Sequence, residues 1–367
     1  MKKSLLELDP DADALLILQR PNLQQVLPRL EDPFAKLIAK LNYKKKTEPT
    51  TTVSPGTITK VKALKNITSL QPERKDGTPN IIVFRVSAKH LSTASSVFRR
   101  MIKGKFRESK PNDQGLLEFR TSDWNSEALL ILLEIIHGHH SHIPESLGQE
   151  TVAHIGIIAA YYDCVDIVKV FYHGWEARFR NEWNSDWPNI DNNTLAETGE
   201  FGKTQQFQLF IAWIFQSDQI FSHLATNAIL IATGPIETYL PVPKRVTEMF
   251  DQRRIALLEQ LFTKLYNLQI FLHEEPEKYD RQSDGRLLGH LMRQMWRMDL
   301  PPAKPEKPFD GYSVFTVAES IRSIKTTRPP YHEGRMDTRK LENCLKFNID
   351  RLYQRSAKIS LKGFGKE

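Results

Sequence analysis

The sequence contains very little cysteine. Its 367 residues include two, Cys164 and Cys344, and 180 positions separate them. Two such distant thiols supply neither a disulfide framework nor a set of thiolate ligands for structural zinc. We therefore expect a protein of a reducing compartment.

Long hydrophobic runs are also missing. The longest, at residues 128–133 and 155–162, fall far short of the roughly 18 apolar residues that span a bilayer. The apolar stretch at the N-terminus is interrupted by four acidic residues, which argues against a signal peptide: Glu7, Asp9, Asp11 and Asp13. The expectation is a soluble intracellular protein of the nucleus or the cytoplasm, with no membrane partner.

The common catalytic signatures are missing as well. The sequence has no G-x-x-x-x-G-K-[ST], G-x-G-x-x-G, H-E-x-x-H or G-x-S-x-G motif. Cys164 lies in an apolar helical junction, where an inert buried thiol fits better than a nucleophile. We expect no catalytic residues, no cofactor and no enzymatic activity.

Positive charge is present but uneven. The chain has a formal net charge of +7, of which residues 40–79 contribute +6 and residues 335–367 contribute +5, so the remainder carries −4. A mildly acidic body with two basic segments reaches a high pI without a surface that reads nucleic acid. No basic helix with interleaved aromatics and no zinc-finger spacing is present, so nucleic acid is not an expected partner.

Strand and helix patterns alternate at short spacing in the first half of the chain. Short apolar runs predict strands at 13–18, 81–86 and 116–120. Helical spacing predicts one helix after Ser87, with Leu91, Ser95 and Phe98 on one face, and further helices at 128–136, 149–160 and 166–180. Residues 21–79 are basic and rich in Pro, Ser and Thr, which indicates an insert with room for a short helix at 33–41.

Strand signals stop after residue 185. Helices are predicted at 207–215 and 220–232, along a stripe of apolar residues after Pro243, at 287–298 and within 309–324. The fold class is therefore α+β, with a mixed first part followed by an all-α region.

The order of these elements resembles a BTB/POZ domain. Val86 with Leu91, Ser95 and Phe98 is similar to that family's strand and helix, and residues 106–109 (FRES) are similar to its f-x-E-s turn. Residues 127–138 resemble its "eal..LL.fiyg" helix, and residues 157–171 resemble its closing helix pair. More narrowly, four phrases resemble fungal BTB-domain proteins: IIHG at 135–138 with Pro144, AYYDC at 160–164, WIFQ at 213–216 and GPIE at 234–237.

The resemblance implies a BTB/POZ fold, a small mixed sheet with packed helices, followed by an all-α C-terminal region. It places the first strand in 1–20, the basic insert at 21–79, the BTB/POZ domain at 80–180, the helical region at 181–325 and a basic tail at 326–367. An insert of about sixty residues departs from the family's short link, but loop-closure entropy grows slowly with length.

The resemblance also implies candidate partner-binding residues. Phe106 and Glu108 resemble the φ-x-E motif by which BTB adaptors hold the cullin scaffold of ubiquitin ligases. The alternative to this partner-binding role is a purely structural one, in which Phe106 belongs to the core and Glu108 is a solvated surface residue.

Four histidines form the most metal-like feature of the chain: His137, His139, His140 and His142. The spacing H-x-H-H-x-H offers imidazoles to an ion, but the cluster contains no Cys, Asp or Glu, and structural zinc needs four converging ligands. The expectation is that it holds no metal.

Three hypotheses about function remain. The first is a non-enzymatic adaptor or scaffold that binds a protein partner or a second copy through its BTB/POZ domain. The second is a substrate receptor of a cullin ubiquitin ligase that uses Phe106 and Glu108. The third is a nuclear transcription or chromatin regulator, based on the basic segments at 40–75 and 335–366.

Overall fold

The structure is a computed structural model, and it describes residues 4–24, 67–184, 201–238, 240–274, 281–325, 341, 345 and 359–364. The chain divides into two compact units. Unit 1 comprises Met1–Ser185 with Thr238–Pro241, and unit 2 comprises Asp186–Glu237 with Val242–Glu367. The helix expected at 33–41, Cys344 and most of the two basic segments lie outside the described residues.

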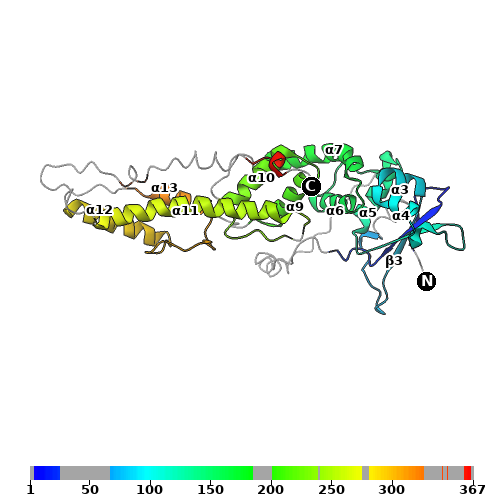
Figure 1. Cartoon of the computed structure of the whole chain (residues 1–367), viewed down its shortest axis with the longest axis horizontal. Coiled ribbons are helices and arrows are strands. Elements are labelled where there is room, and N and C mark those ends of the chain that lie inside the picture. Colours follow the sequence, from blue (N-terminus) through cyan, green and yellow to red (C-terminus); the bar gives the residue numbers. More distant parts are fainter. Residues whose placement is uncertain are drawn as a thin grey trace, which may run out of the picture. The chain divides into compact units, whose positions relative to one another are not determined.

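Unit 1 contains a mixed four-stranded sheet in the order β1-β3-β2-β4 (Figure 1). Its strands are β1 (Ser4–Glu7), β2 (Ala14–Gln19), β3 (Ile81–Val86) and β4 (Leu117–Ser122). β2 is antiparallel to β3, whereas β4 runs parallel to β2 and β1 runs parallel to β3. One row of side chains, Leu6, Phe84, Leu16 and Phe119, crosses all four strands, and its last three members are buried.

The strands at β2, β3 and β4 lie where they were predicted, but β1 was not predicted. Its four residues, SLLE, are too few to show an alternating pattern. β1 is held by parallel pairing with β3, in which Leu5 lies opposite Val83. Such a partner, more than seventy residues away, cannot be read from the local sequence.

The helix predicted after Ser87 is in fact two helices, α3 (Ala88–Ala94) and α4 (Ser96–Lys103). Ser95 between them is extended, and its hydroxyl accepts a hydrogen bond from the Phe98 N–H at 3.0 Å while donating to the Tyr162 carbonyl. The side chain is fully buried. Ser95 thus caps the second helix at the point where the first one ends.

Three longer helices complete unit 1: α5 (Ser126–Ile136), α6 (Gln149–Tyr161) and α7 (Val165–Asn184). α5 packs against both α6 and α7. Nine of its eleven residues are buried, as expected of a helix enclosed by other elements.

The two ends of the predicted insert belong to unit 1. The Asn22 side chain donates to the carbonyls of Ile67 (3.1 Å) and Leu70 (3.0 Å) and accepts from the Ser126 N–H at 2.8 Å. Ile67 itself is buried. Residues 21–24 and 67–79 are therefore part of the packed unit 1 and do not belong to a linker.

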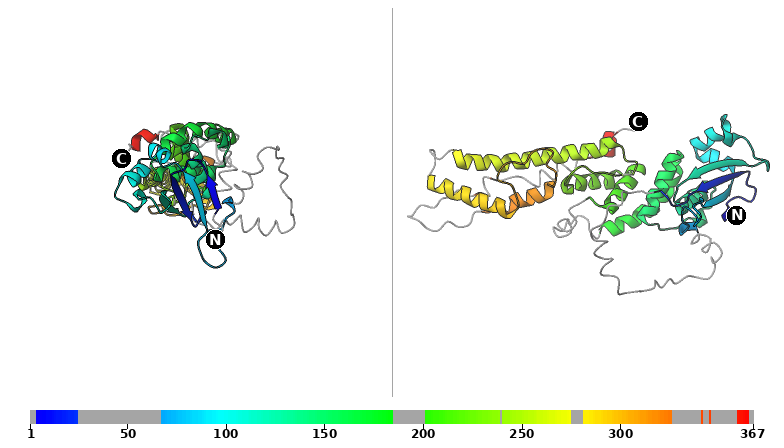
Figure 2. Two further views of the ribbon diagram at one scale, coloured as in Figure 1. Left: turned by 90° about the vertical axis from the view of Figure 1, so that its right-hand side faces the viewer. Right: turned by 90° about the horizontal axis from the view of Figure 1, so that it is seen from below.

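The described part of unit 2 is helical. It contains α9 (Lys203–Ile214), α10 (Asp218–Ile231), α11 (Lys244–Glu274), α12 (Arg281–Arg297) and α13 (Val314–Ser323). α10 packs on α9, α11 and α13, and α11 also packs along α12 (Figure 2). At the centre, the fully buried Arg254 side chain bonds to the carbonyls of residues 308, 309 and 312.

Four helices end in the same Schellman geometry, in which the first residue past the cap is left-handed. The positive φ angles are 76° at Gly138, 53° at Asp163, 59° at Gln216 and 53° at Asp299. The next N–H donates to the carbonyl five residues earlier: His139 to Glu134, Cys164 to Ala159, Ser217 to Ala212 and Leu300 to Met295. Three of the four phrases that carry the family resemblance lie at such helix ends.

The fold class is therefore mixed α+β, with a small four-stranded mixed sheet and predominantly helical remaining elements among the described residues. No helix in the described ranges is both long and apolar enough to cross a membrane.

Candidate functional site

Phe106 lies on the surface, in the connection between α4 and β4. Its side chain is 56% exposed, so the alternative that places it in the core is wrong. A 3₁₀ turn, η2 (Arg107–Ser109), follows at once and carries the partly exposed Glu108. The two residues of the φ-x-E pattern thus lie together on one short exposed turn.

The turn holds the Phe106 backbone in place. The Phe106 carbonyl accepts from the Ser109 hydroxyl at 2.7 Å and from the Ser109 N–H at 3.3 Å. The ring lies against Gly104, where an added Cβ would come within 2.5 Å of two ring carbons and 2.7 Å of the Arg100 carbonyl oxygen. A side chain at position 104 would displace the ring, so this glycine permits the observed position of Phe106.

Four cationic residues lie within four positions of Phe106 in the sequence. Lys103, Lys105, Arg107 and Lys110 are all exposed. Arg107 also lies near Glu118 of β4, whose pKa is lowered chiefly by the Asn112 amide and the Arg120 guanidinium, with a smaller contribution from Arg107. The turn therefore presents one large apolar group and one carboxylate within a basic surface.

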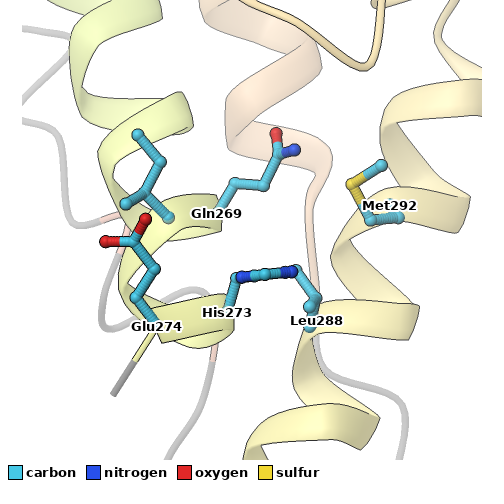
Figure 3. A pocket seen from close by; sticks show the side chains of 6 residues that line it. Gln269, His273, Glu274, Leu288 and Met292 are labelled. Atoms are coloured by element: carbon cyan, nitrogen blue, oxygen red, sulfur yellow. The ribbon is translucent and has the colours of Figure 1, made fainter.

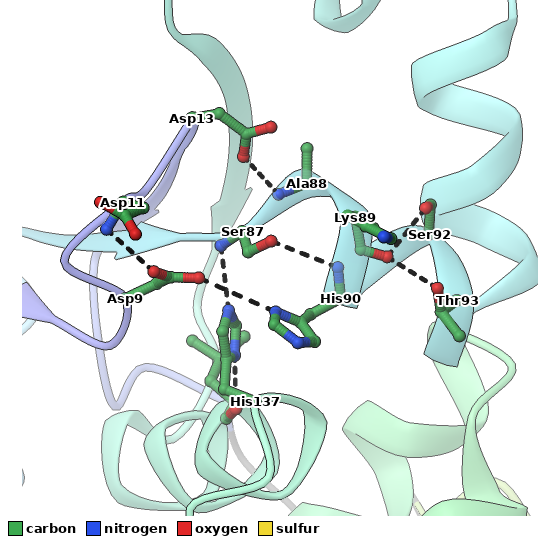
Figure 4. A network of polar contacts seen from close by, with 11 residues as sticks. Asp9, Asp11, Asp13, Ser87, Ala88, Lys89, His90, Ser92, Thr93 and His137 are labelled. Carbon is green, nitrogen blue, oxygen red and sulfur yellow. Dashed lines mark hydrogen bonds and ion pairs between the residues drawn. The ribbon is translucent and has the colours of Figure 1, made fainter.

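His137, the first of the four clustered histidines, has a structural role. Its Nδ1 donates to the Leu133 carbonyl at 2.8 Å, and its Nε2 accepts from the Ser87 N–H at 3.0 Å (Figure 4). Burial lowers its pKa, which favours the neutral ring that this pair of bonds requires. His137 therefore joins the end of α5 to the start of α3.

The other three histidines separate into two groups. The ring of His140 packs edge-on against Phe171 of α7, with 5.3 Å between the ring centroids. His139 and His142 instead turn toward Glu134, and their Nδ1 atoms lie 2.5 Å and 3.2 Å from the same carboxylate oxygen. Glu134 was not among the predicted site residues because it precedes the histidine run, although the spacing E-x₄-H-x₂-H was available as a signal.

Two further features carry little chemistry. Burial raises the pKa of the Cys164 thiol to about 12, so this thiol stays protonated at neutral pH.

A hollow of about 190 Å³ lies between α11 and α12, lined by Gln269, His273, Glu274, Leu288 and Met292 with Ile270 (Figure 3). It is smaller than the roughly 300–1,000 Å³ of most ligand pockets.

Comparisons with known protein families, with characterised proteins and with solved structures found no match to this chain.

Proposed function

We propose that this protein is a non-enzymatic adaptor or scaffold of the BTB/POZ type, and that the Phe106 turn is where it binds a protein partner. The observation that carries the proposal is the exposed phenyl ring of Phe106, held on a hydrogen-bonded turn beside Glu108. Interfaces derive most of their affinity from a few large anchors of this kind, which enter a pocket of the partner.

The charges around the ring indicate the chemistry of the partner. Four exposed cationic residues lie within four positions of Phe106 in the sequence, so a partner with an apolar pocket and an acidic rim would be attracted to this surface. Glu108 then adds one charge of the opposite sign, which fixes the orientation of the bound partner. Burying the ring of a phenylalanine contributes about 1.5–3 kcal/mol.

A substrate receptor of a cullin ubiquitin ligase is the second candidate. Two observations favour it: Phe106 is exposed, as an anchor must be, and Glu108 lies on the same turn. The turn also lies between a helix, α4, and a strand, β4, which supports this candidate because the φ-x-E motif of the family that the sequence resembles lies in such a connection. In this version the cullin is the partner with the apolar pocket, and the helices of unit 2 bind the substrate.

The test is affinity capture of the tagged full chain from its own cells, followed by mass spectrometry. The variant Phe106→Ala with Glu108→Arg should lose the partner. Val170→Ser is the matched control, because Val170 is also an exposed apolar residue of unit 1, at 73%, but lies on α7. Partners captured equally with all three proteins would overturn the assignment of the turn.

A direct binding measurement separates the two candidates. If purified cullin binds the wild type and Val170→Ser, and Phe106→Ala weakens binding by about 2 kcal/mol or more, the ligase role is supported. Gly104→Ala should weaken binding of the same partner because it displaces the Phe106 ring, although both motif side chains are still present. If the captured partner is another protein and cullin does not bind, the adaptor role stands and the ligase role is excluded.

A further inference from the structure

We propose that Glu134, His139 and His142 form a binding site for a divalent transition-metal ion of the zinc class. One oxygen or nitrogen atom from each residue lies within 4.8 Å of the other two. The site is separate from the Phe106 turn, and the inference does not depend on the adaptor function.

The end of α5 explains why these three side chains converge. The left-handed Gly138, at φ 76°, reverses the chain, and the His139 N–H then bonds to the Glu134 carbonyl at 3.0 Å. This Schellman bond returns His139 to the turn of the helix that carries Glu134. A 3₁₀ turn, η3 (His140–His142), follows and closes with a bond from the His142 N–H to the His139 carbonyl at 2.9 Å.

The backbone therefore places both imidazoles above one carboxylate. The ring centroids of His139 and His142 are 5.3 Å apart. The other two histidines of the run are directed elsewhere, since His137 uses both ring nitrogens within the fold and His140 packs on Phe171. The structure thus selects two histidines from four and supplies the carboxylate that the histidine run lacks.

The donor set fits zinc chemistry. Two imidazole nitrogens and one carboxylate oxygen are three of the donors that zinc prefers, with bonds of about 2.0–2.2 Å, which place neighbouring donors roughly 3.4 Å apart in a tetrahedron. The 3.2 Å from the Glu134 oxygen to His142 Nδ1 already matches, and the 2.5 Å to His139 must lengthen as the ion replaces the hydrogen bond.

Exposure leaves room for a fourth ligand. The side chains of His139 and His142 are 34% and 35% exposed, whereas Glu134 is 16% exposed. The ion would therefore bind the mostly buried Glu134 carboxylate on one side and face solvent on the other, where a water molecule is the fourth ligand of the tetrahedron. Three protein ligands with one open position are the arrangement of an accessible zinc site rather than a closed structural one.

The experiment is titration of the tag-free, chelator-treated full chain with zinc, followed by calorimetry, and with cobalt, followed by its visible absorption. Glu134→Gln and His142→Gln should each weaken the tightest zinc site by about tenfold or more and abolish the tetrahedral cobalt bands. His140→Gln is the control from the same turn and should leave both signals unchanged. The other histidines of the chain, which has 11 in all, can also bind zinc weakly. The zinc affinity of each variant is therefore compared with that of the wild type.

Loss of folding is separated from loss of a ligand by the thermal melt of each variant without metal. The exposed His142→Gln should melt as the wild type does, and zinc should raise the melting temperature of the wild type more than that of this variant. Equal zinc affinity and equal cobalt spectra in the wild type, Glu134→Gln and His142→Gln would overturn the proposal.

Discussion

Buried serines cap helices in both units, at Ser87 and Ser95 of unit 1 and at Ser313 of unit 2, but of the described residues a fully buried arginine is found in unit 2 alone. In unit 2, a buried guanidinium at Arg254 in the middle of α11 bonds to the backbone of residues 308–312, more than fifty positions away. Each serine cap therefore fixes a local change of chain direction, to which Ser95 adds one bond to the Tyr162 carbonyl, whereas Arg254 holds a distant segment through three of its carbonyls.

The strongest test of this difference is Arg254→Met. The substitution removes the guanidinium donor from the carbonyls of Pro308, Phe309 and Tyr312, of which Phe309 keeps the Tyr312 N–H. It also removes the partner of Asp251, whose oxygen lies 2.8 Å from Arg254 Nε. We expect the free energy of unfolding of unit 2 to fall by about 3–5 kcal/mol. Urea unfolding gives the total, and hydrogen exchange in α11 and α13 locates the change.

A surface ion pair of the same unit provides the control. Arg322 lies 3.0 Å from Glu319 on α13, and both side chains are partly exposed. Arg322→Met should cost no more than about 0.5 kcal/mol. Equal effects of the two substitutions would show that the buried arginine does not join the two segments.

Ser95→Ala is the corresponding test in unit 1. It removes the acceptor of the Phe98 N–H and the donor to the Tyr162 carbonyl at a site with no solvent access. The expected cost is about 2 kcal/mol, from the lost cap and the unpaired carbonyl. Faster hydrogen exchange should be confined to α4 and the end of α6, with unit 2 unchanged.

Ser92→Ala, in the preceding helix, is the matched control. The Ser92 hydroxyl donates only to the Lys89 carbonyl three residues earlier, at 3.0 Å in an exposed position. Its removal should change stability by less than about 0.5 kcal/mol. If Ser95→Ala is equally mild, the helix pair is fixed by packing and not by the cap.

The parts of the fold that follow from local sequence patterns could be predicted, and the parts that depend on distant partners could not. Apolar periodicity located the strands at β2, β3 and β4 and the helices from α5 to α13, because burial of one face is a local pattern. The split at Ser95 could not be predicted, since the carbonyl that accepts its hydroxyl is 67 residues away. Three of the four left-handed helix ends could not be predicted either, because Asp163, Gln216 and Asp299 occupy the position at which glycine is the usual signal.

The candidate sites divide in the same way. Residue types and order identified Phe106 and Glu108, but the exposure of the ring and its position against Gly104 are known only from the structure. The histidine run was noticed, but Glu134 joins it only because the chain reverses at Gly138. In both cases the sequence supplied the functional groups and the backbone geometry decided which of them meet.

The smallest predicted effect concerns acid stability and His223 of α10. Burial lowers the pKa of His223 to about 4, and its Nε2 lies 2.7 Å from the Asn227 amide nitrogen, which donates to the neutral ring. In the unfolded chain the pKa is about 6.5. Well above pH 6.5, His223 is neutral in both the folded and the unfolded state and has no pH-dependent effect on stability.

As the pH falls from about 6.5 to 4, the unfolded chain takes up a proton that the folded unit does not, so unfolding becomes progressively more favourable and the effect levels off below pH 4. Partial solvent access limits the loss to about 1–2 kcal/mol. His223→Gln should remove this part of the pH dependence, measured as the difference between wild-type and variant unfolding free energies at pH 7 and pH 4.5. Hydrogen exchange at low pH should then be slower in α10 of the variant and unchanged in α5; the same pH dependence in both proteins would show that His223 is protonated in the folded unit.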